Sequence, residues 1–176
     1  RRAGTQRLMS FHQPFLNHDA VQFPAADILL GKPLPVRSAE LFYQSLKGPF
    51  DPAKQLQWLL DTPQRLQQYL ALAQGLGTRV RVNIELDVGL HRGGVSDPGV
   101  LGQMLALISQ HPQHLEFAGF MGYDPFVGMG VPGILGSTEE LFAKVMVIYK
   151  RCVDFTRQQY PGLWHAGLTL NTAGSP

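Results

Sequence analysis

The ten residues from Arg79 to Val88 alternate strictly between polar and apolar side chains. A period of two is typical of a β-strand with two different faces. One face carries Val80, Val82, Ile84, Leu86 and Val88, and the other carries Arg79, Arg81, Asn83, Glu85 and Asp87. The strand runs into a glycine-flanked arginine, Arg92, in the segment GLHRGGV. Buried charges are tolerated when they are paired or bound to a ligand. The pattern therefore indicates either a confined charged site or an antiparallel strand with a solvated face and a turn.

Predicted strands and helices alternate along the rest of the chain. Strands are expected at residues 7–11, 26–30, 55–60 and 115–123 and from residue 168 onward. Helices are expected at residues 12–23, 38–46, 63–76, 98–111 and 138–160. Four of them begin at a typical helix-capping residue: Ser38, Thr62, Ser96 or Asp97, and Ser137, which forms a capping box with Glu140. Alternating elements of this kind predict an α/β fold with a parallel sheet, either open and doubly wound or a barrel.

The barrel is favoured, because the GxxxxGK[ST] pattern of nucleotide-binding open sheets is absent from the sequence. We therefore expect a partial parallel (β/α)8 barrel of the TIM type. In such a barrel the carboxyl ends of the strands carry the active site. Asn83, Glu85, Asp87 and Arg92 are then expected to converge at that end.

The composition excludes several classes of protein. The 176 residues are 44% apolar and 16% charged, with a net charge of +2. The sequence has no basic cluster of the kind that binds nucleic acid. No apolar run is long enough for a membrane span and no signal peptide opens the sequence, so a cytoplasmic protein is the expectation. The single cysteine, Cys152, excludes a disulfide framework and is expected in the core. Residues 1–176 are interpreted as one domain, incomplete at both ends.

Three stretches, in order, resemble the fold-type III pyridoxal phosphate (PLP) enzymes, whose barrel is like that of alanine racemase. The segment ELDVGLHRGGV from Glu85 is similar to the E-x-D-x-G-x-x-R-x-G stretch of that family. LEFAGFMGYD, ending at Asp124, looks like the next strand of the family, which ends in Gly-x-x-x-Tyr. TLNTAGSP, ending at Pro176, is similar to its phosphate-binding strand end. Within the family, the D-threonine aldolase and D-serine dehydratase-like subgroup is the most similar.

The resemblance implies a set of cofactor-binding residues. It places Arg92 at the phenolic oxygen of PLP, and Glu85 where alanine racemase has a carboxylated lysine that orients the arginine. Tyr123 is expected at the edge of the cofactor ring or at the substrate, and the phosphate is assigned to Asn171, Thr172, Ala173, Gly174 and Ser175. Backbone N–H groups in a glycine-containing turn, with a serine hydroxyl, suit a dianion. A structural ion pair, a core tyrosine and an ordinary turn are the simpler alternatives for these residues.

The Schiff-base lysine of the family is not found in its usual motif. It is expected upstream of Arg1, so the catalytic residue is unknown and we expect the isolated chain to be inactive. Lys32 follows a predicted strand but lies in a different motif, and a loop lysine is the default interpretation. The six histidines show no metal-ligand spacing, and His91, beside Arg92, is the one of interest. Any divalent metal, as in the aldolase and dehydratase subgroup, is expected to bind residues beyond Pro176.

The resemblance thus predicts a PLP-dependent lyase, an aldolase or dehydratase acting on a D-amino acid such as D-threonine or D-serine. One alternative is a PLP-dependent amino-acid racemase on the same scaffold. Another is a PLP-binding carrier protein without turnover, and a third is a barrel that acts on a sugar phosphate without PLP. The expected partner is a small amino-acid substrate rather than nucleic acid or membrane, and a homodimer is an assembly that the resemblance implies.

Overall fold

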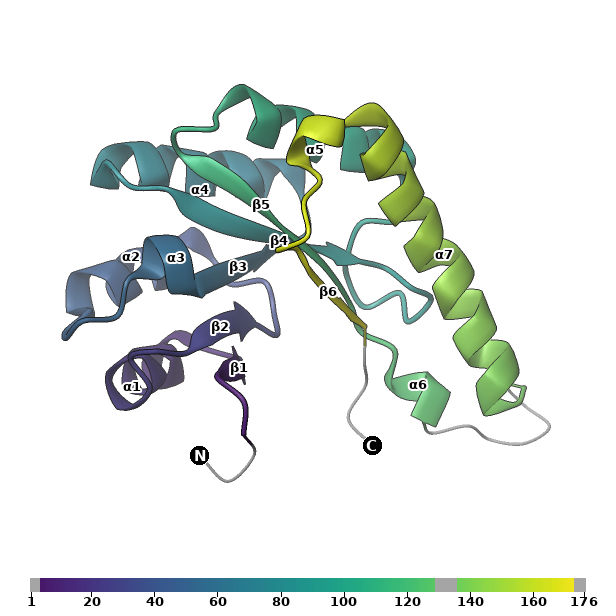
Figure 1. The fold of residues 1–176 in the computed structure, drawn as a ribbon, viewed down its shortest axis with the longest axis horizontal. Helices are drawn as coiled ribbons and strands as arrows, with labels where there is room; N and C mark the ends of the chain where they lie inside the picture. Colours follow the sequence, from purple (N-terminus) through teal and green to yellow (C-terminus); the bar gives the residue numbers. More distant parts are fainter. Residues whose placement is uncertain (1–3, 129–135, 173–176) are drawn as a thin grey trace.

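The computed structural model describes residues 4–128 and 136–172 as a parallel sheet with helices on its outer side (Figure 1). The sheet has six strands in the order β1-β2-β3-β4-β5-β6, and every neighbouring pair is parallel. The strands are β1 (Arg7–Ser10), β2 (Asp27–Leu30), β3 (Leu56–Leu60), β4 (Val80–Leu86), β5 (Leu115–Gly122) and β6 (Thr169–Thr172). The predicted partial barrel is therefore confirmed, with β1 and β6 as its two edges. The antiparallel alternative for β4 is wrong.

The strands are connected by helices, as expected for parallel neighbours. The helices are α1 (Gln13–Gln22), α2 (Val36–Ser45), α3 (Pro52–Gln55), α4 (Pro63–Leu76), α5 (Pro98–Gln110), α6 (Pro125–Gly128), α7 (Thr138–Gln159) and the 3-10 turn η1 (Pro161–Leu163). The one-turn helices α3 and α6 were not predicted, because four residues are too short for a helical pattern in the sequence.

Most helix starts follow the predicted capping chemistry. The side chains of Thr62, Asp97 and Ser137 each accept a backbone N–H in the first turn of their helix, and Ser137 with Glu140 forms a capping box. Gly77 ends α4 in the left-handed region, at φ 60°. The prediction for Ser38 is wrong: α2 begins earlier, after Pro35, and Ser38 lies inside its first turn.

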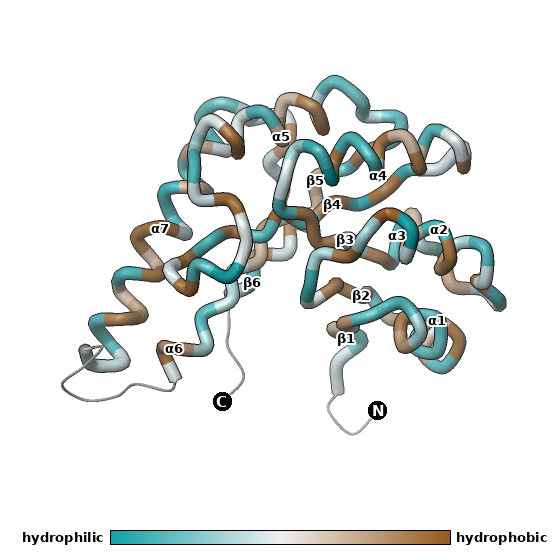
Figure 2. The backbone as a smooth tube through the Cα atoms, turned by 180° about the vertical axis from the view of Figure 1, so that it is seen from behind, coloured by the Kyte–Doolittle hydropathy of each residue, from teal (hydrophilic) through white to brown (hydrophobic). Residues whose placement is uncertain are grey.

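The core lies between the outward face of the sheet and the helices. Val80, Val82, Ile84 and Leu86 of β4 are buried there, and α4 and α5 bury the predicted residues Leu66, Tyr69, Leu70, Ala73, Leu101, Met104, Leu105 and Ile108. Figure 2 shows hydrophobic colours along β2 and β3, inside the molecule, and mixed colours along the helices. In α2 the predicted apolar face is wrong at Leu41, which is exposed, whereas Ala39 and Phe42 are buried. Cys152 is only half-buried against the core.

Candidate functional site

The segment that follows β4 folds back onto the end of that strand. Val95 forms a parallel bridge with Leu86: the Asp87 N–H donates to the Val95 carbonyl at 3.1 Å, and the Val95 N–H donates to the Glu85 carbonyl at 2.8 Å. The chain turns back toward the strand at Gly94, whose φ of +98° is a conformation that favours glycine. This fold-back places Arg92 beside the carboxyl end of β4.

Glu85 and Arg92 form an ion pair at that end. Arg92 Nη2 lies 3.3 Å from Glu85 Oε1, and the Glu85 side chain is 4% exposed whereas that of Arg92 is 40% exposed. Burial raises the pKa of Glu85, and Asp61 and Asp87 add to that rise, while Arg92 opposes it. The pairing of these two residues is observed, and their role toward a cofactor stays a prediction.

Tyr123 completes this group from the neighbouring strand. It directly follows β5, and the guanidinium carbon of Arg92 lies 4.2 Å from the centre of its ring. A guanidinium stacked on an aromatic face and paired with a carboxylate has its plane held on two sides. The exposed part of Arg92 therefore presents oriented N–H donors to an anion at this edge of the sheet.

Within the described residues, Asp87 forms no ion pair with Arg92. Its carboxylate instead accepts hydrogen bonds from the Gly89 and His91 backbone N–H groups and lies 2.8 Å from His91 Nδ1. Burial acts to raise the pKa of Asp87, but these contacts from His91 and Gly89 together lower it. Asp87 thus shapes the loop that carries Arg92, and it holds His91 at the positive φ of 56°.

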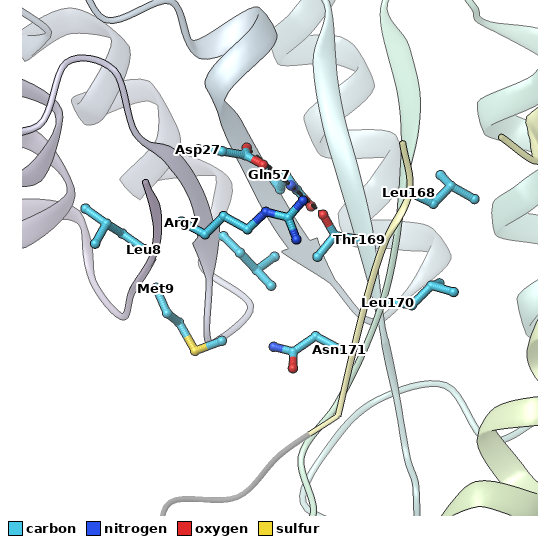
Figure 3. A pocket seen from close by; sticks show the side chains of 10 residues that line it. Arg7, Leu8, Met9, Asp27, Gln57, Leu168, Thr169, Leu170 and Asn171 are labelled. Carbon is cyan, nitrogen blue, oxygen red and sulfur yellow. Dashed lines mark hydrogen bonds between the residues drawn. The ribbon is translucent and has the colours of Figure 1, made fainter. Parts of the chain in front are cut away.

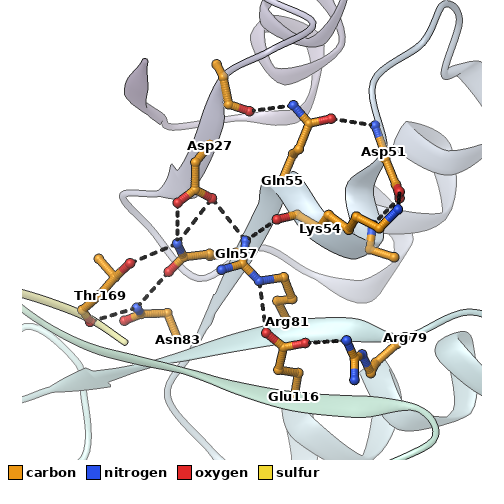
Figure 4. Close-up of polar contacts among 12 residues, drawn as sticks. Asp27, Asp51, Lys54, Gln55, Gln57, Arg79, Arg81, Asn83, Glu116 and Thr169 are labelled. Carbon is orange, nitrogen blue, oxygen red and sulfur yellow. Dashed lines mark hydrogen bonds and ion pairs between the residues drawn. The ribbon is translucent and has the colours of Figure 1, made fainter. Parts of the chain in front are cut away.

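Asn83 lies deeper in the half-barrel than was predicted. Its side-chain amide donates to Gln57 Oε1 at 3.1 Å, and Gln57 donates in turn to Asp27 and to the Thr169 hydroxyl (Figure 4). The expected convergence is therefore wrong for Asn83, because it lies one layer of inward-facing residues below Glu85. Figure 4 also shows Arg81 between Asp27 and Glu116, at 3.0 and 3.3 Å. This network ties the amino-terminal parts of β2 to β6 together.

The end of β6 lies at the same edge of the sheet as the ion pair. In the strand register Glu85 is opposite Met121, and Met121 is opposite Asn171. Thr172 donates its hydroxyl to Asp124 at 3.0 Å, and the Asp124 side chain is buried. Of the residues predicted for the phosphate, Asn171 and Thr172 are thus placed, whereas Ala173, Gly174 and Ser175 lie outside the described residues.

A cavity of about 480 Å³ separates the two edge strands. Arg7 and Met9 of β1 face Thr169 and Asn171 of β6 across it, whereas Leu170 points away (Figure 3). The floor is formed by Asp27, Leu29 and Gln57. Asn171 therefore lines this cavity from the β6 side.

The sequence analysis missed several polar residues of the inner face. Asp27 and Gln57 interrupt the apolar runs of β2 and β3, and this interruption was the available signal. Asp61, which follows β3 and pairs with Arg65, was not among the predicted site residues. Lys32 is exposed after β2, as a loop lysine would be.

Among residues 4–128 and 136–172, no three or more His, Cys, Asp or Glu side chains form a group that could hold a metal ion. Of the helices in the described part of the chain, none has the length and hydropathy needed to cross a membrane.

Comparisons with known proteins agree with this geometry. Residues 33–161 match the family model described as "Alanine racemase, N-terminal domain". No curated protein sequence matches the chain. Among solved structures, an alanine racemase from Clostridium difficile 630 has a TM-score of 0.72 at 12% identity, with 98% of this chain and 41% of that chain covered.

Two further solved structures have the same fold. The alanine racemase from Bacillus anthracis has a TM-score of 0.57 at 13% identity, and the match covers 98% of this chain and 50% of that chain. The D-threo-3-hydroxyaspartate dehydratase from Delftia sp. HT23 has a TM-score of 0.55 at 18% identity, with 96% and 52% covered. The chain therefore spans about half or less of the length of these proteins, and at these identities the likeness concerns the fold.

Proposed function

Because this chain belongs to the family of the alanine racemase N-terminal domain, we propose that it binds PLP at the carboxyl edge of its sheet. The family and its structural neighbours are PLP-dependent enzymes, and they include both a racemase and a dehydratase. Bound PLP would supply an electron sink for chemistry at the α-carbon of an amino acid. We propose further that the complete protein is a lyase, an aldolase or dehydratase, acting on a D-amino acid.

The observation that carries the proposal is the group formed by Glu85, Arg92 and Tyr123. An anionic phenolic oxygen needs a cation whose N–H donors point in a fixed direction. Arg92 is held by a buried carboxylate at 3.3 Å and by an aromatic ring at 4.2 Å, yet 40% of its side chain is exposed. These residues therefore fit the phenolic side of the cofactor.

The phosphate side of the cofactor has weaker support. Thr172 stands at the correct edge, but its hydroxyl proton is directed to Asp124. Because that proton is already used, we expect the backbone N–H groups of the chain after β6, rather than the Thr172 hydroxyl, to donate to a phosphate. Asn171, whose side chain lines the cavity beside β6, remains a proposed ligand.

PLP binding is tested by fluorescence titration of the chain with PLP. Replacing Arg92 with Ala is expected to weaken binding about tenfold or more, because a charge-assisted hydrogen bond contributes roughly 1.5–3 kcal/mol. Arg79→Ala is the matched control, since Arg79 also pairs with a glutamate, Glu116 at 2.8 Å, but at the other end of β4. Absence of saturable binding, or equal losses in the two variants, would refute the proposal.

The reaction class is tested on the complete protein with D-threonine and D-serine. Glycine with acetaldehyde indicates an aldolase, a keto acid with ammonia indicates a dehydratase, and the L-enantiomer indicates a racemase. The lyase proposal rests on the E-x-D-x-G-x-x-R-x-G stretch from Glu85 to Gly94. Formation of the L-enantiomer alone would overturn it while leaving PLP binding intact.

A further inference from the structure

A second carboxylate stands beside the Glu85–Arg92 pair. Asp61 is the first residue after β3, the strand next to β4. Arg65, on the first turn of α4, places Nη1 2.5 Å from Asp61 Oδ1, and the Asp61 side chain is only 18% exposed. Because Thr62 caps the same helix, Asp61 is held in place by both its backbone and its side chain.

Gly93 shows how near the two carboxylates are. A Cβ atom built on Gly93 would lie 3.8 Å from Asp61 Oδ2 and 3.9 Å from Glu85 Oε2. The two carboxylate oxygens can therefore be no more than 7.7 Å apart, the sum of these two distances, and residue 93 has no side chain to separate them. Charges of the same sign at this range, and largely out of water, repel each other.

The four charged residues form two neighbouring ion pairs. Arg65 pairs with Asp61 and Arg92 pairs with Glu85, and Gly93 lies beside one carboxylate oxygen of each pair. Asp87 also acts on Glu85, but its carboxylate is engaged by the His91 loop. Asp61 is thus the acid from a neighbouring strand end that acts on Glu85.

We propose that Asp61 is a positioning residue that acts through Glu85 to hold Arg92 in its orientation over Tyr123. Repulsion from Asp61 raises the energy of the Glu85 carboxylate, so Glu85 depends on its pairing with Arg92 for its charged form. Arg65 occupies the Asp61 carboxylate and so prevents it from competing for Arg92. This inference deepens the proposed function. It rests on that proposal only for the role of the oriented Arg92, which is to bind PLP.

The inference predicts how Glu85 titrates in the chain without added cofactor. Carbon-13 NMR of the glutamate carboxyl groups follows this titration, and Glu85→Gln identifies the Glu85 signal. The groups that face Glu85 are Arg92 and Asp87 from the β4–α5 segment and Asp61 from the end of β3. Asp61→Asn removes one negative charge, so the midpoint of the Glu85 titration is expected to move to lower pH.

Two further variants separate electrostatics from general loosening of the site. Arg65→Gln removes a positive charge behind Asp61, so it is expected to leave the Glu85 midpoint unchanged or move it to higher pH. Asp51→Asn is the matched control, because Asp51 likewise pairs with a basic residue of the helix that follows it, Lys54 at 3.0 Å. Asp51 precedes β3 at the opposite edge of the sheet, so Asp51→Asn is expected to leave the titration midpoint of Glu85 unchanged.

The outcomes are exclusive. A downward shift in Asp61→Asn alone supports the inference. No shift beyond that of Asp51→Asn, or a downward shift of similar size in Arg65→Gln, overturns it. Because these titrations need no PLP, a chain that fails to bind PLP would refute the proposed function and leave this result standing. If PLP binds, the pH below which its affinity falls is expected to shift downward in Asp61→Asn as well.

Discussion

Gly94 holds the Arg92 loop against β4, and its replacement by alanine tests that arrangement. The glycine has a φ of +98°, and an added Cβ would lie 2.5 Å from the Asp87 nitrogen and 2.6 Å from the Leu86 carbonyl carbon. Both contacts are with backbone, so no side-chain rotation can relieve them. The segment from residue 87 to residue 95 must therefore move away from the strand.

The expected loss follows from the contacts at this point. A side chain forced into this conformation costs about 1–3 kcal/mol. Opening the bridge between Leu86 and Val95 also removes two backbone hydrogen bonds, of 3.1 and 2.8 Å, each contributing about 0.5–1.5 kcal/mol. We expect Gly94→Ala to lower the free energy of unfolding by about 2–6 kcal/mol.

Urea unfolding followed by circular dichroism measures this change, and the neighbouring glycine provides the control. An alanine Cβ at Gly93 would make contacts of 3.8 Å and longer, which are ordinary van der Waals distances. Gly93→Ala is therefore expected to stay within about 0.5 kcal/mol of the parent chain. Equal stability of the two variants would refute the assignment of the fold-back to Gly94.

Three further predictions concern the same edge of the sheet and the strand that leads to it. Burial raises the pKa of Glu85 above its ordinary value of 4.5. The contribution of Glu85 to stability is therefore complete below pH 4.5 and is lost as the pH rises through the folded-state pKa. Urea unfolding at several pH values should show this decline in the free energy of unfolding. Thr172→Val removes the hydrogen bond to the buried Asp124 and is expected to cost about 1–3 kcal/mol in the same unfolding assay. Gly119→Ala would place a Cβ 1.9 Å from the Thr169 oxygen at a φ of +136°, and is expected to cost about 3–5 kcal/mol by separating β5 from β6.

Each of these predictions has its own control. Glu85→Gln should abolish the pH-dependent component, and an unchanged pH profile would contradict the assignment to Glu85. Thr172→Ser keeps the hydroxyl and is expected to lose less than Thr172→Val, and an equal loss in the two variants would contradict the role given to the hydrogen bond. Gly75→Ala, in α4 with open space around the added Cβ, is expected to be neutral or stabilising. A loss there as large as that at Gly119 would show that the clash is not the cause.

The sequence carried enough local information to determine the elements and the chemistry of their ends. The alternation from Arg79 to Val88 predicted β4 and the side chains on its inward face. The caps at Thr62, Asp97 and Ser137 were predictable because each side chain bonds to a backbone N–H three residues away. The pairing of Glu85 with Arg92 was also accessible, because both belong to one motif and lie seven residues apart, on either side of a tight turn.

The tertiary structure alone decided which strand ends become neighbours. Asp61 lies near Glu85 because β3 is next to β4, and Tyr123 lies under Arg92 because β5 is on the other side. The helical connections between these strands put the residues far apart in the chain, so no local pattern links them. Sequence periodicity specifies which face of a strand turns inward, but the packing of the curved sheet specifies which charges on that face meet.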